Sequence, residues 1–519
     1  MRRGELTVGE VFANAARAVP RATAVALGDA TLTFGHLEAG AGAAACALAD
    51  LGVGPGHVVA VWSGTSLDVV PLFAGLARAG AVYAPMGAGL RSDDARALLE
   101  AARPSLLVVD AEHEDAGHAL ASASGVPLAT LTGLAALASG RAEAPRRPGP
   151  GASLADGARH TARPGPPAPF VGEDDPHVIF FTSGSTGRPK GVVLSHRVNV
   201  LRTHPGALLE RRGAMVCPYP LFHMGAWTIA LQQWQARAGV VLLERADAPG
   251  IVNAVARHGA TRLNAIPAVW RRVIDAVAGE GATGTSGATA GPTSLATLRF
   301  ADTGTSATPV ELLEAIAAAA PAAQIRVFYG STEAGSVAAL AHQDIGRKPG
   351  SCGVPVSGVE ARLSGAGELL VRSPALFDGY YGDDAATAEA FDDGWYRTGD
   401  LAEMDDEGYL TIVGRVRDVI RTGGETLSPS EVEAVLATHH AVADVAVVGI
   451  PDPTWGEVVC AVVVVVPGAA VPTTEELRAH GQARLAAFKL PRRVAAVDAI
   501  PRTPATRQVM RRLLVERLG

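Results

Sequence analysis

The sequence predicts an α/β protein of two or more domains, with helices packed around a parallel β-sheet. Helical and strand-like patterns alternate through the first hundred or so residues, which is typical of β-α-β units. A chain of 519 residues is also too long for one ordinary domain. A shorter α+β pattern follows residue 414 and indicates a further domain at the C-terminal end.

The elements of the N-terminal part follow from their apolar patterns. Residues 7–18, 35–51 and 69–78 have helical patterns, and Thr7 is placed to cap the first of them. Residues 58–62 and 106–109 are short apolar runs typical of buried strands.

In the C-terminal part, residues 431–439 and 475–485 have helical patterns, and residues 445–450 resemble a strand. The longest apolar run, residues 458–466, is much shorter than the roughly 20 residues that a membrane span needs. We therefore expect it to be a buried strand. The N-terminal residues lead into no apolar segment of a signal peptide, so we expect a cytoplasmic protein without a membrane partner.

Composition is that of a globular protein, with 48% apolar and 19% charged residues. A net charge of −7 gives no electrostatic reason to expect nucleic-acid binding. The four cysteines have no metal-ligand spacing and are expected to be buried thiols in a reducing compartment. Residues 140–176 and 279–293 are rich in Gly, Pro, Ala, Ser or Thr and are expected to be a linker and a surface loop.

The clearest chemical signal is the stretch of residues 181–191, Phe-Thr-Ser-Gly-Ser-Thr-Gly-Arg-Pro-Lys-Gly, directly after an apolar run that ends at Phe181. A strand that runs into such a turn favours phosphate binding, because glycines bring backbone N–H groups close to an anion and hydroxyls and a lysine add donors. The pattern is not a Walker A motif. Its candidate phosphate ligands are Thr182, Ser183, Gly184, Ser185, Thr186, Gly187 and Lys190.

This stretch resembles the signature loop of the adenylate-forming superfamily, which includes acyl- and aryl-CoA ligases, stand-alone adenylation domains and luciferases. Further segments match that superfamily in order along almost the whole chain. The resemblance implies a large N-terminal domain of parallel and mixed sheets with flanking helices and a small, mobile α+β C-terminal domain. The boundary would lie near Arg417, giving domains of residues 1–416 and 417–519.

The segment Pro220-Leu221-Phe222-His223 resembles the superfamily's Pro-x-Phe-His motif. In acyl- and aryl-activating members this histidine lies beside the carboxylate pocket. Relatives that activate amino acids typically carry an aspartate in this neighbourhood, so the Phe-His pair favours an organic acid without an amine. By proximity to the motifs, the candidate substrate contacts are His223, Trp227, Asn264, Thr303, Gly304, Gly330 and Ser336.

Two segments are expected to hold the adenine and the α-phosphate. Gly304, Thr305 and Ser306 fall where relatives have Gly-Gly-Ala beside the adenine, although the match is degraded. Residues 329–333 match the motif Tyr-Gly-x-Thr-Glu. The resemblance implies that Tyr329 stacks on adenine, that Thr332 binds the α-phosphate and that Glu333 holds Mg²⁺, a cation that prefers oxygen ligands. Gly330 and Ser331 belong to the same nucleotide-binding segment.

The ribose and the hinge are assigned in the same way. Asp400, at the end of Trp-Tyr-Arg-Thr-Gly-Asp, would accept hydrogen bonds from both ribose hydroxyls. Arg415 would reach the ribose or phosphate, and Arg417 would stand at the hinge about which the small domain turns. Ile412 is a further candidate nucleotide contact.

The pattern fails at one catalytic position near the C-terminus, where relatives carry a lysine. Aligned from Pro501 that position is Arg507, and aligned from Arg511-Arg512 it is Gln508. Arginine keeps the charge but has a planar fork in place of a compact ammonium group. Lys489 matches a different lysine of the family's small domain and does not replace the missing one.

The motifs imply ATP-dependent adenylation of a small organic acid with release of pyrophosphate, using ATP and Mg²⁺, followed by transfer to CoA. Arg507 would then take the lysine's catalytic role beside His223, Lys190, Thr332 and Glu333. Three alternatives stay open: a diazotase-like reaction that activates nitrite and joins it to an aryl amine, transfer to a carrier protein, or a nucleotide-binding homologue without turnover. The identity of the acid and the oligomeric state, a homodimer included, are also open.

Overall fold

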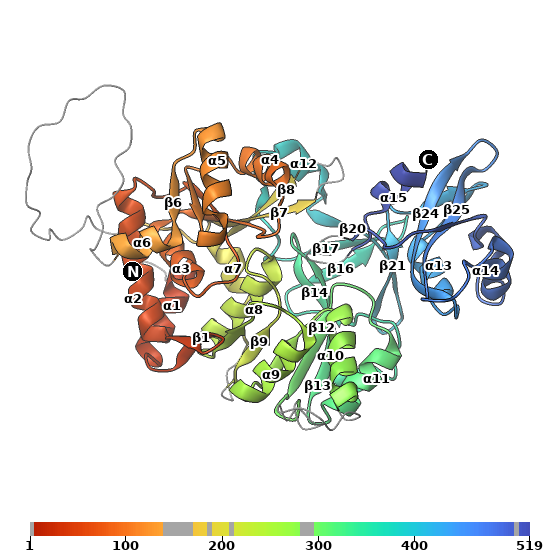
Figure 1. Ribbon diagram of the computed structural model, residues 1–519, viewed down its shortest axis with the longest axis horizontal. Coiled ribbons are helices and arrows are strands. Elements are labelled where there is room, and N and C mark those ends of the chain that lie inside the picture. The colour runs from red at the N-terminus through yellow and green to blue at the C-terminus, as the bar shows by residue number, and fades with distance from the viewer. Residues whose placement is uncertain are drawn as a thin grey trace, which may run out of the picture.

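The computed structural model describes residues 5–138, 170–183, 189–206, 212–280, 295–502 and 508–518. The expected linker and surface loop lie largely outside these ranges. The large N-terminal domain and the smaller C-terminal domain lie side by side and are joined after strand β21 (Leu410–Arg415), as Figure 1 shows. No helix in the described ranges is long and apolar enough to cross a membrane.

The first sheet of the large domain has nine strands among the described residues and is parallel in its middle. Its outer strands β2, β14 and β15 run antiparallel to their neighbours. In spatial order the strands are β15 (Val354–Pro355), β14 (Gly335–Leu340), β13 (Gln324–Ser331), β12 (Phe300–Gly304), β11 (Arg262–Asn264), β9 (Met215–Cys217), β10 (Val240–Leu242), β1 (Thr23–Leu27) and β2 (Ala30–Thr33).

The second sheet has seven strands within the described ranges, and β7 and β8 form its antiparallel hairpin beside a parallel core. Because β7 and β8 flank residues 184–188, this sheet positions the predicted phosphate loop. The spatial order is β18 (Gly379–Tyr380), β8 (Pro189–Ser195), β7 (Pro176–Ser183), β4 (Val82–Met86), β3 (Val58–Trp62), β5 (Leu106–Val109) and β6 (Leu128–Thr130).

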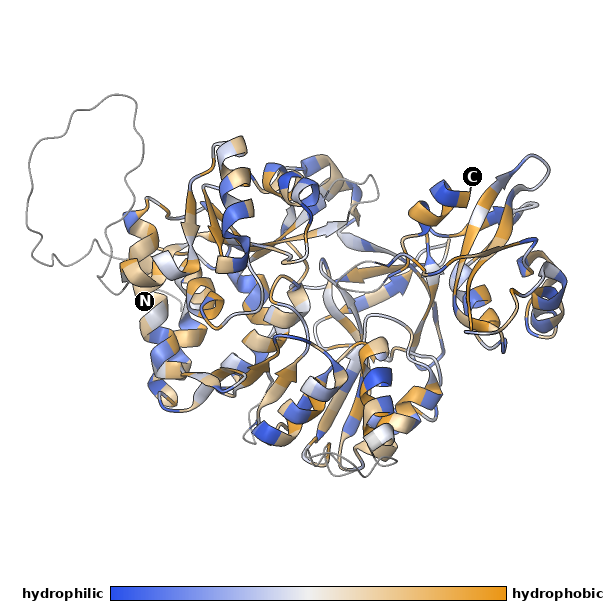
Figure 2. Ribbon diagram, in the orientation of Figure 1, coloured by the Kyte–Doolittle hydropathy of each residue, from blue (hydrophilic) through white to orange (hydrophobic). Residues whose placement is uncertain are grey.

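A middle layer of helices packs between the two sheets, because a single apolar core contains residues from both sheets and from these helices. The middle layer consists of α1 (Val8–Ala18), α2 (Phe34–Asp50), α3 (Val69–Ala79), α7 (His196–Arg202) and α8 (Met224–Gln235). A second core covers the other face of the first sheet with α9 (Ala248–His258), α10 (Pro267–Glu280) and α11 (Val310–Ala319). A third packs α4 (Ser92–Ala102) and α5 (Glu114–Ser124) on the second sheet. In Figure 2 the strands of the sheets are largely hydrophobic in colour.

A smaller antiparallel sheet completes the large domain and carries the predicted ribose-binding residue. It contains β16 (Glu360–Leu363), β17 (Glu368–Arg372), β20 (Trp395–Met404), β19 (Phe391–Asp392) and β21. The remaining helices of the large domain are α6 (Leu131–Ala138) and α12 (Asp384–Glu389).

The C-terminal domain packs helices on a sheet of its own, whose apolar strands form two small cores. The strands are β22 (Ile420–Thr422), β23 (Glu425–Leu427), β24 (Val442–Asp452), β25 (Gly456–Val465) and β26 (Arg493–Ala496). The helices are α13 (Pro429–Leu436), α14 (Thr474–Gly481) and α15 (Arg511–Leu518).

Most of the expected elements are confirmed, and β3 and β5 have the expected bounds. Thr7 is the N-cap residue of the first helix, as expected, but its side chain makes no capping hydrogen bond. Helix α14 ends at Gly481, four residues before the expected end. One cysteine also differs from expectation: Cys46 is exposed because it lies on the solvent side of α2, and Cys352 is half-buried.

Candidate active site

The hairpin of β7 and β8 presents the described part of the predicted phosphate loop. Thr182 pairs with Lys190 across the hairpin, and both side chains are half-buried. Gly184, Ser185, Thr186 and Gly187 lie outside the described residues, so their role as phosphate ligands stays a prediction.

The segment of Thr332 and Glu333 follows β13 and is held from behind by an arginine of α7. The Arg202 guanidinium donates to the carbonyl oxygens of Ala375 and Thr332, both at 2.7 Å, and to that of Glu333. Burial lowers the pKa of Arg202 to about 10, so the group is still cationic at neutral pH. Its three backbone contacts fix the two predicted ligand residues without using their side chains.

Lys190 of β8, Tyr380 of β18 and Glu333 of the turn after β13 come together. The Lys190 ammonium nitrogen lies 4.9 Å from the centroid of the Tyr380 ring. The Tyr380 hydroxyl donates to Glu333 Oε1 at 3.3 Å. A cation and a carboxylate therefore lie on either side of one tyrosine, which suits a ligand with both phosphate and metal.

A second cluster joins the same segment to the antiparallel sheet. The Tyr329 hydroxyl donates to Asp400 Oδ2 at 2.6 Å, and Arg415 Nε lies 2.9 Å from Asp400 Oδ1. Asp400 is 5% exposed, and its pairing with Arg415 follows the register of β20 and β21. A carboxylate has about four acceptor sites, so two hydrogen bonds leave capacity for a diol.

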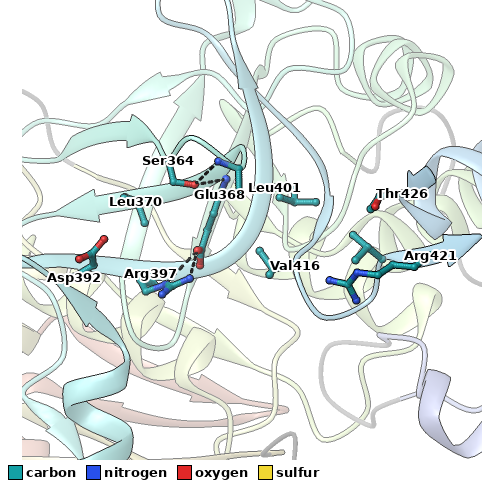
Figure 3. A pocket seen from close by; sticks show the side chains of 11 residues that line it. Ser364, Glu368, Leu370, Asp392, Arg397, Leu401, Val416, Arg421 and Thr426 are labelled. Carbon is teal, nitrogen blue, oxygen red and sulfur yellow. Dashed lines mark hydrogen bonds and ion pairs between the residues drawn. The ribbon is translucent and has the colours of Figure 1, made fainter. Parts of the chain in front are cut away.

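A buried glutamate braces the part of β20 that carries Asp400. Glu368 accepts from Gly399 N at 3.1 Å and from Arg397 Nη2 at 2.8 Å. These residues line a cleft of about 570 Å³ between the two domains, and Figure 3 shows Arg397 directed at Glu368, with Arg421 and Thr426 of the C-terminal domain across from them. None of the predicted site residues lines this cleft, so it is separate from the predicted site.

The predicted adenine-binding segment lies where β12 and β13 end. Gly304 pairs with Phe328, and a Cβ there would lie 2.2 Å from the Phe328 carbonyl oxygen. A Cβ on Gly330 would lie 2.0 Å from the Gly335 carbonyl oxygen, so both positions require glycine. Thr305 and Ser306 are exposed, and Thr305 has φ of +68°, which is strained for a β-branched residue. Ser331 accepts a hydrogen bond from Ala334 N.

A third cluster contains the predicted carboxylate-pocket histidine. His223 precedes α8 and caps it, because His223 Nδ1 accepts from Gly225 N at 3.0 Å. Its ring stacks on Tyr219 at 5.9 Å, and the Tyr219 hydroxyl donates to Asn264 Oδ1 at 2.8 Å. Burial lowers the pKa of His223 to about 4, so the imidazole is neutral at physiological pH.

The structure does not bring every predicted site residue into these clusters. Trp227 is 2% exposed and stacks on Phe73 at 3.9 Å, inside the core between the sheets. The Thr303 hydroxyl is buried without a hydrogen-bond partner in the described part of the chain. Ser336 is exposed and pairs with Gly330, Ile412 packs on the core, and Arg507 lies outside the described residues.

Sequence reasoning missed Arg202, Tyr380 and Glu368. Arg202 lies 130 residues from Thr332 along the chain, and no local pattern marks such a contact. The Gly379-Tyr380-Tyr381 triplet offered a weak signal, because an aromatic residue beside glycine often marks a close approach to a ligand or backbone.

Comparison with known families agrees with this geometry. Residues 12–381 match the family described as AMP-binding enzyme, and residues 431–507 match its C-terminal domain. The chain belongs to the AMP-binding enzyme family.

Curated members of this AMP-binding family match nearly the whole chain. A feruloyl-CoA synthase from Amycolatopsis is 33% identical over 94% of this chain and 94% of its own. An indoleacetate–CoA ligase from Aromatoleum aromaticum is 32% identical over 93% of each chain. Among solved structures, ATP-bound MatB from Rhodopseudomonas palustris matches with a TM-score of 0.81, 26% identity and 98% of each chain covered.

Proposed function

We propose that this protein is an AMP-forming acid–CoA ligase, which adenylates an organic acid with ATP and transfers the acyl group to CoA. The observation that carries the proposal is that residues 329–333 belong to two clusters at once, the Lys190–Tyr380–Glu333 cluster and the Tyr329–Asp400 pair. The neutral His223 adds a third cluster with Tyr219 and Asn264. Ligase names on relatives over most of the chain support the same conclusion.

The nucleotide would be held by the cluster of Tyr329, Asp400 and Arg415. The hydrogen bond to Asp400 fixes the Tyr329 ring, which would stack on adenine at the end of β13. Asp400 would use its remaining acceptor sites for the ribose hydroxyls. Gly304, Thr305 and Ser306 would border the base.

The phosphates would lie between Lys190 and Thr332, with Mg²⁺ at Glu333. No group of three or more His, Cys, Asp or Glu in the described ranges could hold a metal alone. Mg²⁺ usually binds one or two carboxylates and completes its shell with waters and substrate phosphates, so Glu333 fits. When bound, the ion would neutralise phosphate charge.

The acid would lie beside His223, Gly304 and Gly330. A carboxylate oxygen of the acid attacks the α-phosphorus, and the bond between the α-phosphorus and its bridging oxygen breaks as pyrophosphate leaves. The product is an acyl-adenylate. The protein supplies positioning and charge neutralisation. Because His223 is neutral and its Nδ1 accepts from Gly225 N, its Nε2–H is left as a donor that can hydrogen-bond the carboxylate without forming an ion pair with it.

Transfer to CoA would involve the domain of residues 417–519, which turns at Arg417. The thiol attacks the acyl carbonyl, AMP leaves, and the thiol proton is released. Arg507 is our candidate for the cation that relatives supply as lysine, with Gln508 as the other position. Arg511, which defines the second alignment, is held by Glu433 at 2.6 Å and Asp418 at 3.3 Å and serves the domain's structure.

The deciding experiment is a panel of acids assayed for AMP release with ATP and Mg²⁺, with and without CoA. Acid-dependent AMP release that CoA stimulates, with an acyl-CoA product, supports the proposal. Release that needs nitrite and an aryl amine and ignores CoA refutes it and indicates the diazotase-like reaction. AMP release that is stimulated by a carrier protein but not by CoA would show that the acceptor is a carrier protein and not CoA. Nucleotide binding without AMP release under any condition would indicate a homologue without turnover.

A further inference from the structure

The face of the first sheet that carries Asn264 also carries a row of charged residues. Asn264 pairs with Asp302 across β11 and β12, and Asp302 pairs with Arg326 across β12 and β13. Side chains alternate between the faces of a sheet. Leu263, Ala301 and Ile325 belong to the core with α9–α11, so this row faces the middle layer, where α8 begins after His223.

The row contains two separate hydrogen-bonded pairs that the strand register places side by side, and the first of them lies at the proposed acid site. Tyr219 stacks on His223 and donates to Asn264. Next in register, Asp302 is 4% exposed, and both its oxygens accept from Arg326 at 2.7 Å. Gly304 and Phe328 form the next row toward the strand ends, two residues or about 6.6 Å away.

The charges beyond this row do not balance. Arg326 is paired with Asp302, but the Arg262 guanidinium lies 3.8 Å from the Phe300 ring centroid and has no hydrogen-bond acceptor among the described residues. Arg212 Nη2 donates to Pro205 O at 2.8 Å, whereas Arg212 Nη1 is buried without an acceptor. Burial, then Arg212 and Arg326, lower the pKa of Arg262 to about 10. Three guanidinium groups therefore share one carboxylate.

We propose that this arginine cluster, Arg212, Arg262 and Arg326, is the far end of the acid site and selects a dicarboxylic acid over a monocarboxylic acid with an apolar tail. The inference rests on the proposed acid–CoA ligase function. Arg262 and Arg212 Nη1 would donate to the second carboxylate, which then supplies the acceptors that the cluster lacks.

The free-energy cost of placing an apolar tail against this row also favours a dicarboxylic acid. An apolar tail end against this row would remove water from charged groups and give them no hydrogen bond in return, which is costly. A carboxylate forms strong, charge-assisted hydrogen bonds with guanidinium groups. The charged row is therefore an unfavourable end for a long alkyl chain, whereas the Arg262 and Arg212 donors that have no acceptor in the described part of the chain attract an anion.

The test is ATP–pyrophosphate exchange by the full chain with matched acids: adipate against hexanoate, and suberate against octanoate. We expect kcat/KM for each dicarboxylate to exceed that of its partner by about tenfold or more, as one good ion-paired contact gives. Arg262→Gln should reduce that ratio to near one, and Arg262→Lys should restore part of it. Arg372→Gln, on an exposed pair with Glu360, is the matched control and should leave the ratio unchanged.

Each other outcome is also decisive. Equal or better use of hexanoate and octanoate would overturn the inference while leaving the ligase function intact. Failure of every acid tested to support ATP–pyrophosphate exchange would overturn both the inference and the proposed ligase function. Stimulation of the hexanoate reaction by inorganic phosphate, without a preference for dicarboxylates, would show that a separate anion fills the cluster and would also overturn the inference. Urea unfolding midpoints of the Arg262 variants show whether a changed ratio accompanies an intact fold.

Discussion

Replacement of Arg202 by methionine tests whether a buried arginine builds the phosphate side of the site. The change keeps much of the side-chain length but removes three hydrogen bonds. The Glu333 carbonyl keeps a donor, the Phe377 N–H at 2.8 Å, whereas the carbonyls of Thr332 and Ala375 lose the guanidinium. Leaving these two half-buried residues without their donor, in contact with a buried side chain, should cost about 2–4 kcal/mol of stability.

The effect on activity should be selective. Thr332 and Glu333 would lose the support behind their backbone, so the KM for MgATP should rise about tenfold or more, which corresponds to about 1.4 kcal/mol. The KM for the acid should change much less, because the Tyr219–Asn264 contact does not involve Arg202. Steady-state kinetics and urea unfolding midpoints of the same samples measure both effects.

Two further variants make the test specific. Arg202→Lys keeps the charge, but a lysine lacks the planar fork with which arginine reaches three carbonyls. Its KM for MgATP and its stability should therefore lie between those of wild type and of Arg202→Met. Arg272→Met is the matched control, since Arg272 also donates to a carbonyl, at 3.3 Å, but lies exposed on α10. An Arg202→Met enzyme with unchanged KM for MgATP would refute the reasoning.

Three other predictions concern the metal, strain and acid stability. Glu333→Gln should raise the Mg²⁺ concentration for half-maximal adenylation about tenfold, whereas the exposed control Glu360→Gln should not. If Glu333→Gln and wild type depend on Mg²⁺ concentration in the same way, Glu333 is not part of the metal site. Thr305→Gly should stabilise the protein by about 1 kcal/mol by relieving its positive φ, and a lower urea midpoint would contradict this. Burial lowers the pKa of His196 from 6.5 to about 4, so the unfolded chain binds the proton first and stability should fall by up to about 3 kcal/mol as pH drops through that window. His196→Gln should flatten the pH dependence of the urea midpoint, and a curve parallel to wild type would exclude His196 as its source.

The sequence predicted those parts of the fold whose signals are local. Apolar runs such as residues 58–62 and 106–109 are buried on both faces of a parallel sheet, so their bounds can be read directly. The three-residue strands β9, β10 and β11 are too short for any periodicity. Thr7 has the right residue type for a cap, but capping also requires a side-chain rotamer that the surrounding contacts decide.

The candidate site was predictable where one motif supplies both residue type and position, as at residues 329–333. It was not predictable where contact is purely tertiary. Arg202 reaches Thr332 from another element, and Trp227, expected near the substrate, is taken up by the core beside Phe73. The arginine cluster has the same origin, since only the register of β12 and β13 brings Arg326 beside Asp302.

The geometry around Asp400 links nucleotide binding to the position of the small domain. Gly399 accepts from Val416 N at 2.9 Å and donates to Glu368 at 3.1 Å, so the part of β20 that carries Asp400 also holds the residue before the proposed hinge. One residue beyond that hinge, Asp418 is bound by Arg511 of the last helix. A nucleotide bound at Asp400, as proposed, would therefore contact a frame that extends into both domains. If nucleotide binding shifts Val416, linkage is reciprocal, and the orientation of the small domain would change the affinity for the nucleotide by the same factor.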